Sequence, residues 1–236
     1  MHIYTHTHIE SAHSRPNRFL ADKGADLKRT QDSMHTGLLL SAVRHRSLEA
    51  LQKLHGYGVD LDTRHWSGNT ALHEAARAGE LELVTFLTSH GAKIDAANDA
   101  SDLPVHAAAM MGHFDVVWSL IKSGASLGEG PKRAALALYA VRHSKLDLLE
   151  HLHANGVEVD AADPHGVTPL TEACRSGHIA AAEWLLQRGA NASVVTSFGE
   201  TPVALAAYGG YFELVWRLNE AGASLDVTSD GGGTPV

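Results

Sequence analysis

Four histidines near the start of the chain have a spacing that resembles a metal-binding tract. His2, His6, His8 and His13 all lie in the first 13 residues, and imidazole is a common ligand of zinc and copper. Residues two apart in an extended segment, such as His6 and His8, point to the same side. A zinc site needs three or four placed ligands, and no carboxylate motif or set of cysteines accompanies the tract. The sequence therefore predicts no metal or other cofactor, and the four histidines remain candidates only.

Nucleophiles and paired carboxylates form no catalytic pattern. The single cysteine, Cys174, occupies a small-residue position of an expected helix, which indicates a packed hydrophobic residue rather than a nucleophile. Glu80 and Glu82 begin another expected helix, where acidic side chains interact favourably with the helix dipole. No G-x-S-x-G, H-E-x-x-H, Walker or G-x-G-x-x-G motif occurs in a strand–helix setting. We therefore predict that the chain is not an enzyme.

The composition excludes several classes of protein. The chain has 236 residues, 44% of them hydrophobic, and a formal net charge of −8, which disfavours a nucleic-acid binder held by phosphate attraction. No stretch approaches roughly 18 uncharged apolar residues, so we expect no membrane span. The first residues, MHIYTHTHIE, lack the basic and apolar regions of a secretory signal. The cytoplasm is therefore the expected compartment.

Glycines recur at a nearly constant period, which indicates a repeat array. The spacings between successive members of the series are 34, 33, 33, 32, 33 and 33 residues. The series consists of Gly24, Gly58, Gly91, Gly124, Gly156, Gly189 and Gly222.

A pair of short helices is expected before each of these glycines from Gly58 onward. The second helix has apolar residues at four slots, as at Leu81, Leu83, Val84 and Leu87, and this spacing marks one face of a helix. The first helix begins with a capping threonine and a proline at its first position, as in TPLTEAC from Thr168. A glycine between the two helices suits the left-handed conformation that ends the first.

These motifs resemble the ankyrin repeat, whose pattern is roughly G-x-TPLHxAAxxGH, an amphipathic helix and GADVN. The resemblance implies an all-α fold, an ankyrin-repeat α-solenoid of stacked helix–turn–helix units with short β-hairpin or turn tips. It also implies non-enzymatic binding of a protein partner through the concave groove and the tips. His73 and His106 occupy the TPLH slot, where the family uses the ring to hydrogen-bond neighbouring backbone.

The period divides the chain into units. Residues 1–33 are expected to form a degenerate N-terminal capping unit, because polar residues replace several apolar slots. Residues 231–236 restart the pattern as the beginning of a truncated further repeat. The expected full repeats are 34–66, 67–99, 100–131, 132–164, 165–197 and 198–230.

Three places depart from the pattern. Arg46 and Ser144 stand where the inter-helix glycine belongs, and a left-handed non-glycine residue costs roughly 1–2 kcal/mol. We expect either backbone strain or a changed turn at both. The spacing also contracts by one residue before unit 132–164, which indicates either drift in a tolerant loop or a local kink with a basic tip at Lys132 and Arg133.

The resemblance places partner-binding positions at the tips and at the exposed ends of the first helices. Met110, Met111 and Tyr139 form an expected apolar centre in a row of arginines, which is typical of a binding hot spot. The other candidates are Arg44, His45, Trp66, Asn69, Arg77, Asp102, Arg142, His143, His165, Arg175, Phe198, Glu200 and Tyr208.

Three functions are consistent with the sequence. The first is a protein-interaction module; the alternatives are a targeting domain of a larger enzyme or effector, and a metal-responsive module using the N-terminal histidines.

Trp118 and Trp216 share a slot on the second helix, where they pack on neighbours or mark a second contact surface. The last full unit keeps apolar helix slots, so self-association through an uncapped C-terminal repeat is a further expectation.

Overall fold

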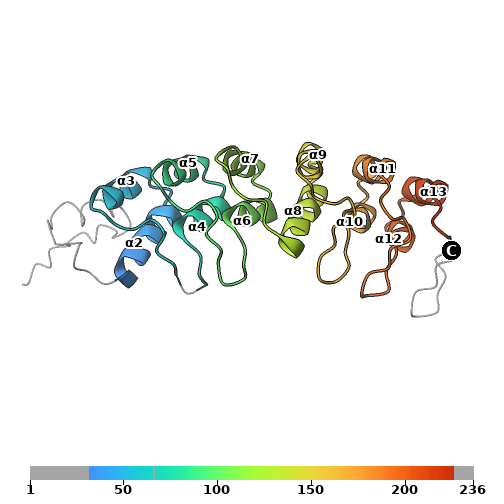
Figure 1. Cartoon of the computed structure of the whole chain (residues 1–236), viewed down its shortest axis with the longest axis horizontal. Helices are drawn as coiled ribbons and strands as arrows, with labels where there is room; N and C mark the ends of the chain where they lie inside the picture. Colours follow the sequence, from blue (N-terminus) through green and yellow to red (C-terminus); the bar gives the residue numbers. More distant parts are fainter. Residues whose placement is uncertain (1–31, 66, 226–236) are drawn as a thin grey trace, which may run out of the picture.

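The computed structural model describes residues 32–65 and 67–225, which form an array of paired helices. Figure 1 shows two rows of helices, with turns projecting below the lower, inner row. The inner helices are α2 (Asp32–Arg44), α4 (Ala71–Ala78), α6 (Pro104–Met111), α8 (Gly130–Arg142), α10 (Pro169–Ser176) and α12 (Pro202–Tyr208). The outer helices are α3 (Leu48–Gly56), α5 (Leu81–Ser89), α7 (Phe114–Lys122), α9 (Leu146–Ala154), α11 (Ile179–Gln187) and α13 (Phe212–Glu220). In these residues the fold is the expected all-α solenoid, without strands.

Threonine and glycine set the ends of the inner helices. The side chain of Thr201 accepts a hydrogen bond from the Ala204 amide at 3.2 Å, which satisfies one free donor at the start of α12. Gly79, Gly112 and Gly177 end α4, α6 and α10 with φ of 73°, 80° and 71°. Glycine adopts this left-handed conformation without a Cβ penalty, so these three inner helices stop where the sequence predicts.

The core consists of thin layers of leucine and alanine between successive units. Leu72 on α4 and Leu87 on α5 are fully buried. Ala75 and Ala76 are fully buried as well, and side chains this small allow α4 and α6 to pack closely. Cys174 occupies the equivalent small-residue position on α10 and is buried, as expected for a packed hydrophobic residue.

The backbone is strained at two of the places that depart from the repeat pattern. Arg46 and Ser144 keep the turn of the glycine that they replace, with φ of 51° and 56°. This confirms the expectation of strain over that of a changed turn. Ser101 also has a positive φ, of 62°, which the repeat pattern did not predict.

The two TPLH-slot histidines bind neighbouring backbone, as the resemblance implies. The Nδ1 atoms of His73 and His106 accept from the amides of Thr70 and Leu103, each at 3.1 Å. Their Nε2–H groups donate to carbonyl oxygens of the next unit, at Asp102 and Lys132, each at 3.0 Å. Burial lowers the pKa of both rings. Each ring therefore works as a neutral link between two units.

Four turns with one hydrogen-bond pattern form the tips. In residues 65–69 the His65 amide donates to the Asn69 carbonyl at 3.0 Å and the Gly68 amide donates back to His65 at 2.8 Å. The same pair of bonds occurs in residues 98–102, 163–167 and 196–200. Ser101 lies at the position that Gly68 occupies in the first tip, which accounts for its positive φ.

The chain forms no such turn before α8. Residues 130–133, where the series predicts a tip, form the first turn of α8, which has 13 residues against eight in α6 and in α10. Figure 1 shows α8 itself reaching down where its neighbours are preceded by a turn. Of the two alternatives for the contracted loop, the basic tip is not formed, because Lys132 and Arg133 lie in the first turn of α8 and the Nζ of Lys132 lies 2.6 Å from the Oδ1 of Asp102 in an ion pair.

Candidate functional site

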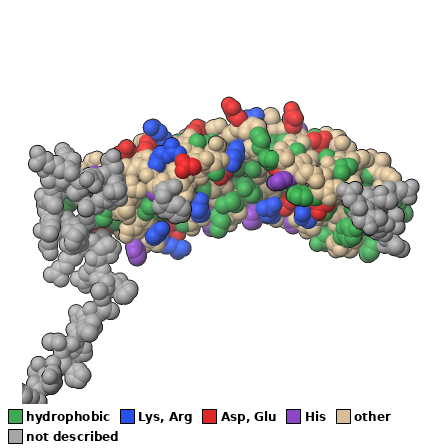
Figure 2. Space-filling view, turned by 90° about the horizontal axis from the view of Figure 1, so that it is seen from below, with side chains coloured by type: hydrophobic (Ala, Val, Ile, Leu, Met, Phe, Trp, Pro, Cys, Tyr) green, Lys and Arg blue, Asp and Glu red, His purple; other side chains and the backbone are tan. Residues whose placement is uncertain are grey.

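The inner helices and the tips together form the surface on which the sequence places partner binding. Figure 2 shows the array from the side of the tips, with hydrophobic side chains gathered near the middle and Lys and Arg on both sides. We call this surface the groove face.

The predicted apolar centre consists of two methionines and a tyrosine. Met110 and Met111 end α6, and 44% and 50% of their surface is exposed. Tyr139 lies on α8, the next inner helix, and is half-buried. Its burial raises the pKa of its phenol, and the guanidinium carbon of Arg142 lies 5.8 Å from the centre of its ring. The structure therefore brings Tyr139 and Arg142 together.

Carboxylates neutralise one end of the arginine row. The Nε–H of Arg142 donates to Glu172 at 2.8 Å, and an Nη2–H of Arg175 donates to Glu200 at 2.7 Å. Arg77 differs, because its Nε is buried and has no hydrogen-bond partner among the described residues. Arg44 is exposed at the end of α2. The unpaired positive charge of the row therefore lies toward α2 and α4.

The two candidate histidines at the ends of inner helices differ in their burial. His45 is exposed. His143 is partly buried, with its ring centroid 5.4 Å from that of Phe114, and its Nε2 is buried without a partner among the described residues. Since the His143 ring also lies against Gly112, it belongs to the packing between two units more than to the groove face.

The candidates on the tips divide into interior and exposed residues. Asn69 is only 3% exposed; its amide donates to Glu74 at 2.9 Å and its carbonyl accepts from Asn98 at 2.7 Å, so it joins two tips. His165 and Phe198 are exposed, with ring centroids 5.3 Å apart. Tyr208 is also exposed. Asp102 and Glu200 are held in the ion pairs given above, and Trp66 lies outside the described residues.

Glu172 positions Arg142, but the sequence motifs did not single it out as a functional residue. Glu172 is buried on α10 and occupies the slot that Glu74 has on α4. The signal was present, since TEAC at Thr171 repeats the HEAA at His73. A charged residue at a recurring inner position requires a partner when buried, and that requirement could have identified the pair.

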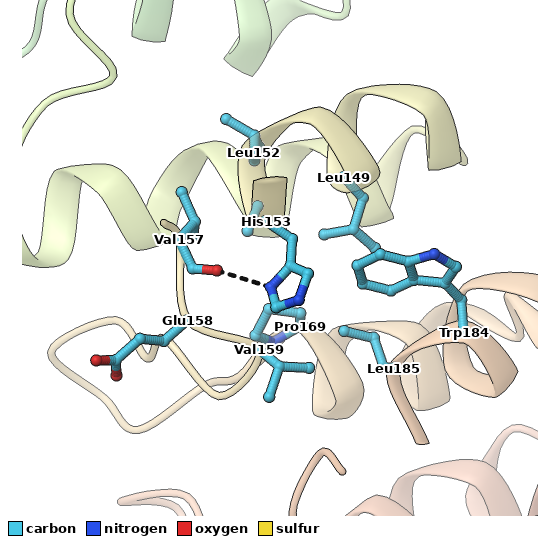
Figure 3. A pocket seen from close by; sticks show the side chains of 10 residues that line it. Leu149, Leu152, His153, Val157, Glu158, Val159, Pro169, Trp184 and Leu185 are labelled. Atoms are coloured by element: carbon cyan, nitrogen blue, oxygen red, sulfur yellow. Dashed lines mark hydrogen bonds between the residues drawn. The ribbon is translucent and has the colours of Figure 1, made fainter. Parts of the chain in front are cut away.

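One cavity in the array is too small for a substrate. It lies among α8, α9, α10 and α11 and has a volume of about 10 Å³, enough for about one water molecule. Figure 3 shows the ring of His153 pointing into it between Val157 and Trp184. The Nδ1–H of His153 donates to the Val157 carbonyl at 3.1 Å. This cavity is a packing defect between two units rather than a ligand site.

The metal candidates remain untested. Among the described residues no group of three His, Cys, Asp or Glu side chains could hold a metal ion. His2, His6, His8 and His13 lie outside those residues. In the same part of the chain no helix has the length and apolar character needed to cross a bilayer.

Comparison with known proteins bears out the resemblance. A family model described as ankyrin repeats (3 copies) matches residues 38–129 and 137–229. The crystal structure of the human ASB11 ankyrin repeat domain is 26% identical with a TM-score of 0.71, and the match covers 84% of this chain and 89% of that one. A chain from the complex of the Bdellovibrio bacteriovorus predatory endopeptidase Bd0816 with immunity protein Bd3460 is 24% identical, with a TM-score of 0.68 over 78% of this chain and 97% of that one.

The second of these likenesses shows the fold alone. No curated protein sequence matches the chain. The two segments matched by the family model together span most of the 236 residues. The chain therefore belongs to the ankyrin repeat family.

Proposed function

We propose that the array binds a protein partner on its groove face, with Met110, Met111 and Tyr139 as the anchoring centre. Ankyrin repeats are generally protein–protein interaction modules and typically not enzymes. The observation that carries the proposal is the adjacent pair of half-exposed methionines at the end of an inner helix. Methionine is flexible and polarisable, and it adapts well to the surface of a partner.

The charges around this centre indicate the partner's chemistry. Arg142 and Arg175 are paired with Glu172 and Glu200, whereas Arg77 keeps a buried Nε without a partner. An acidic group of the partner would therefore gain most beside the ends of α2 and α4, where Arg44 is exposed and neither Arg44 nor Arg77 forms an ion pair with a described residue. The proposed partner has an apolar patch next to an acidic one, and the proposed compartment is the cytoplasm.

A paired capture experiment tests the groove face. The full chain, the Met110→Ala/Met111→Ala/Tyr139→Ala variant and a control variant are used as baits in parallel, and recovered proteins are quantified by mass spectrometry. The control is Leu81→Ala/Ile179→Ala, which removes comparably exposed apolar side chains from the first turns of α5 and α11 in the outer row. Circular dichroism verifies that all three fold.

The proposal predicts a partner that the full chain and the control capture and the triple variant does not. With that partner purified, the triple substitution should raise the dissociation constant by about 30-fold or more, which corresponds to roughly 2 kcal/mol. Equal capture by the triple variant would place the binding surface elsewhere.

A further inference from the structure

One residue from the last turn of each inner helix belongs to a row that runs along the groove face. In every unit it is the residue two positions before the inter-helix glycine or its replacement. Two members are apolar and well exposed, Met110 at 44% and Tyr208 at 68%. We call this set the helix-end row. From α2 to α12 it reads Arg44, Arg77, Met110, Arg142, Arg175 and Tyr208.

The charges of the helix-end row differ on the two sides of Met110. The two arginines between Met110 and the other apolar member are neutralised by Glu172 and Glu200, at 2.8 and 2.7 Å. Arg44 and Arg77, on the opposite side, form no ion pair with a described residue, and Arg44 is exposed. A partner that lies along the row therefore meets a basic stretch, an apolar position, a neutral stretch and a second apolar position, in that order.

The neutral stretch offers few free polar groups to the backbone of a partner. Arg142 and Arg175 donate to Glu172 and Glu200, so these side chains already use each other. An extended segment lying on this stretch would need partners for its own N–H and C=O groups, because a buried backbone group left unpaired is costly. An α-helix pairs these groups within itself. A helix is therefore the form of segment that suits the neutral stretch.

The separation of the two apolar positions matches whole turns of a helix. The inner helices α6, α8, α10 and α12 pack side by side in that order (Figure 1). Packed helices lie about 8–10 Å apart, so Met110 and Tyr208 are separated by about 24–30 Å along the array. A helix covers this distance in about 18 residues, which make five full turns. Two side chains with that spacing lie on the same face of a helix and can reach both positions.

We infer that the partner presents an amphipathic α-helix that lies along the helix-end row and is anchored at both Met110 and Tyr208. The inference rests on the proposed function for the contact at Met110, and it adds Tyr208 as a second anchor and the shape of the bound segment. The helix carries two apolar residues about 18 positions apart. Its acidic end, beyond the residue that contacts Met110, lies near Arg44, which fixes the direction of binding.

Nuclear magnetic resonance titration of the full chain with designed helices tests this inference. The probe is a capped helix of alanine and glutamine with two leucines about 18 residues apart and glutamates at one end. In the matched control the leucines are about nine residues apart, which is two and a half turns and places them on opposite faces. Labelled methionine methyl groups and tyrosine rings report on Met110, Met111 and Tyr208.

The signals of Met110, Met111 and Tyr208 should shift along one saturation curve when the probe is added. The control helix should bind at least about ten-fold more weakly, because it can engage only one anchor at a time. Replacing the glutamates of the probe by glutamine should weaken its binding several-fold to the parent chain, and should have a smaller effect on binding to Arg44→Gln.

A tyrosine substitution separates this inference from the proposed function. Tyr208→Ala should bind the probe about ten-fold more weakly than the parent does, while the methionine signals still shift. Tyr57→Ala is the matched control, because Tyr57 is also exposed but follows α3 in the outer row, and it should bind as the parent does. Met110→Ala/Met111→Ala should weaken binding of the probe and of the control helix alike.

Several results would overturn the inference. If the methionine signals shift and Tyr208 does not, the second anchor is wrong and the proposed anchoring centre still stands. If neither helix shifts any of these signals, the helical partner is wrong, and the capture experiment tests the groove face separately. Equal binding by a probe with a central proline would assign the row to an extended segment. Shifts that arise on concentrating the chain without peptide would assign it to a second copy.

Discussion

The Nε–H of Arg142 on α8 donates a 2.8 Å hydrogen bond to the Oε1 of Glu172, a buried carboxylate on the next inner helix. A side chain that the sequence assigns to the binding surface thus also holds two units together. Arg175 and Glu200 repeat the relationship one unit later. Half of the arginine row on the groove face therefore has a structural role, and the free charge lies on the other half.

Removing Arg142 should destabilise the array. In Arg142→Ala the carboxylate of Glu172 stays buried without its cation, which should lower the free energy of unfolding by about 1–3 kcal/mol. Urea denaturation followed by circular dichroism measures the change. Arg44→Ala, at the same slot of another unit but exposed and without an ion pair to a described residue, should change the stability by less than about 0.5 kcal/mol. Equal effects of the two substitutions would contradict a supporting role for the pair.

Ser101→Gly should stabilise the protein. Ser101 is exposed and its φ is 62°, a conformation that costs a serine more than a glycine. The entropy that glycine gains in the unfolded state offsets part of this, so we expect a net gain of about 0.5 kcal/mol in thermal or urea unfolding.

The reverse substitution is the control for this prediction. Gly68 lies at the same position of another tip, and a Cβ there would collide with Asp99 and Arg64. Gly68→Ser should therefore destabilise the protein by more than about 1 kcal/mol. A stabilising Gly68→Ser would refute the role assigned to this tip position.

The sequence predicted the paired helices well because a fixed glycine period and a repeated apolar pattern act locally. It did not predict that α8 begins at Gly130, although Pro131 at the next position is a helix-start signal. The sequence also did not predict the burial of Asn69, because that side chain binds Asn98 of the next tip. Contacts between units depend on how the repeats stack, and the residue at one position of a single repeat does not determine that stacking.

Stability should fall as the solution becomes acidic. Burial lowers the pKa of His73 and His106, so between those lowered values and about 6.5 the unfolded chain binds protons that the folded chain does not. The contribution of the two neutral rings to the free energy of unfolding is complete above about pH 6.5. Below that pH it is lost, by up to about 1.4 kcal/mol per pH unit for each ring. Urea midpoints at pH 7.5, 6.5 and 5.5 measure the trend.

A histidine substitution separates these rings from the other titrating groups. His73→Gln should be less stable than the parent at pH 7.5 but should lose less stability on acidification. His165→Gln, which removes an exposed histidine of a tip, should keep the parent's slope. A urea midpoint of the parent protein that does not change between pH 7.5 and 5.5 would contradict the prediction.

Cys174 should be unreactive in the folded protein. It is buried, and this burial raises the pKa of its thiol to about 12, so almost no thiolate exists at neutral pH. A chromogenic disulfide reagent should modify less than about a tenth of the thiol in native protein over an hour, and one thiol per chain in guanidinium chloride. Rapid modification of the native chain would show that α10 opens readily.

Self-association is expected through the outer helix of the last described unit. Phe114 and Trp118 on α7 contact Lys145 and His151 of the next unit. Their equivalents on α13, Phe212 and Trp216, are 73% and 64% exposed. Exposed aromatic surface of this kind favours association.

Sedimentation velocity over a hundred-fold range of concentration measures this association. The full chain should shift toward a dimer as its concentration rises, and Phe212→Ser/Trp216→Ser should remain monomeric. Leu81→Ser/Ile179→Ser, in the first turns of α5 and α11, is the control and should associate as the parent does. Association that is unaffected by the aromatic substitutions would move the contact to another surface.

The missing turn before α8 also has a mechanical meaning. Each unit of a solenoid contacts only its neighbours, so a load along the array passes through every boundary in series. Tips joined by backbone hydrogen bonds brace two of these boundaries, Ser67 with Asp99 and His165 with Ser197. No such brace exists on either side of residues 130–133 within the described chain. Bending should concentrate there, so that the molecule flexes as two stiff arms about a softer joint.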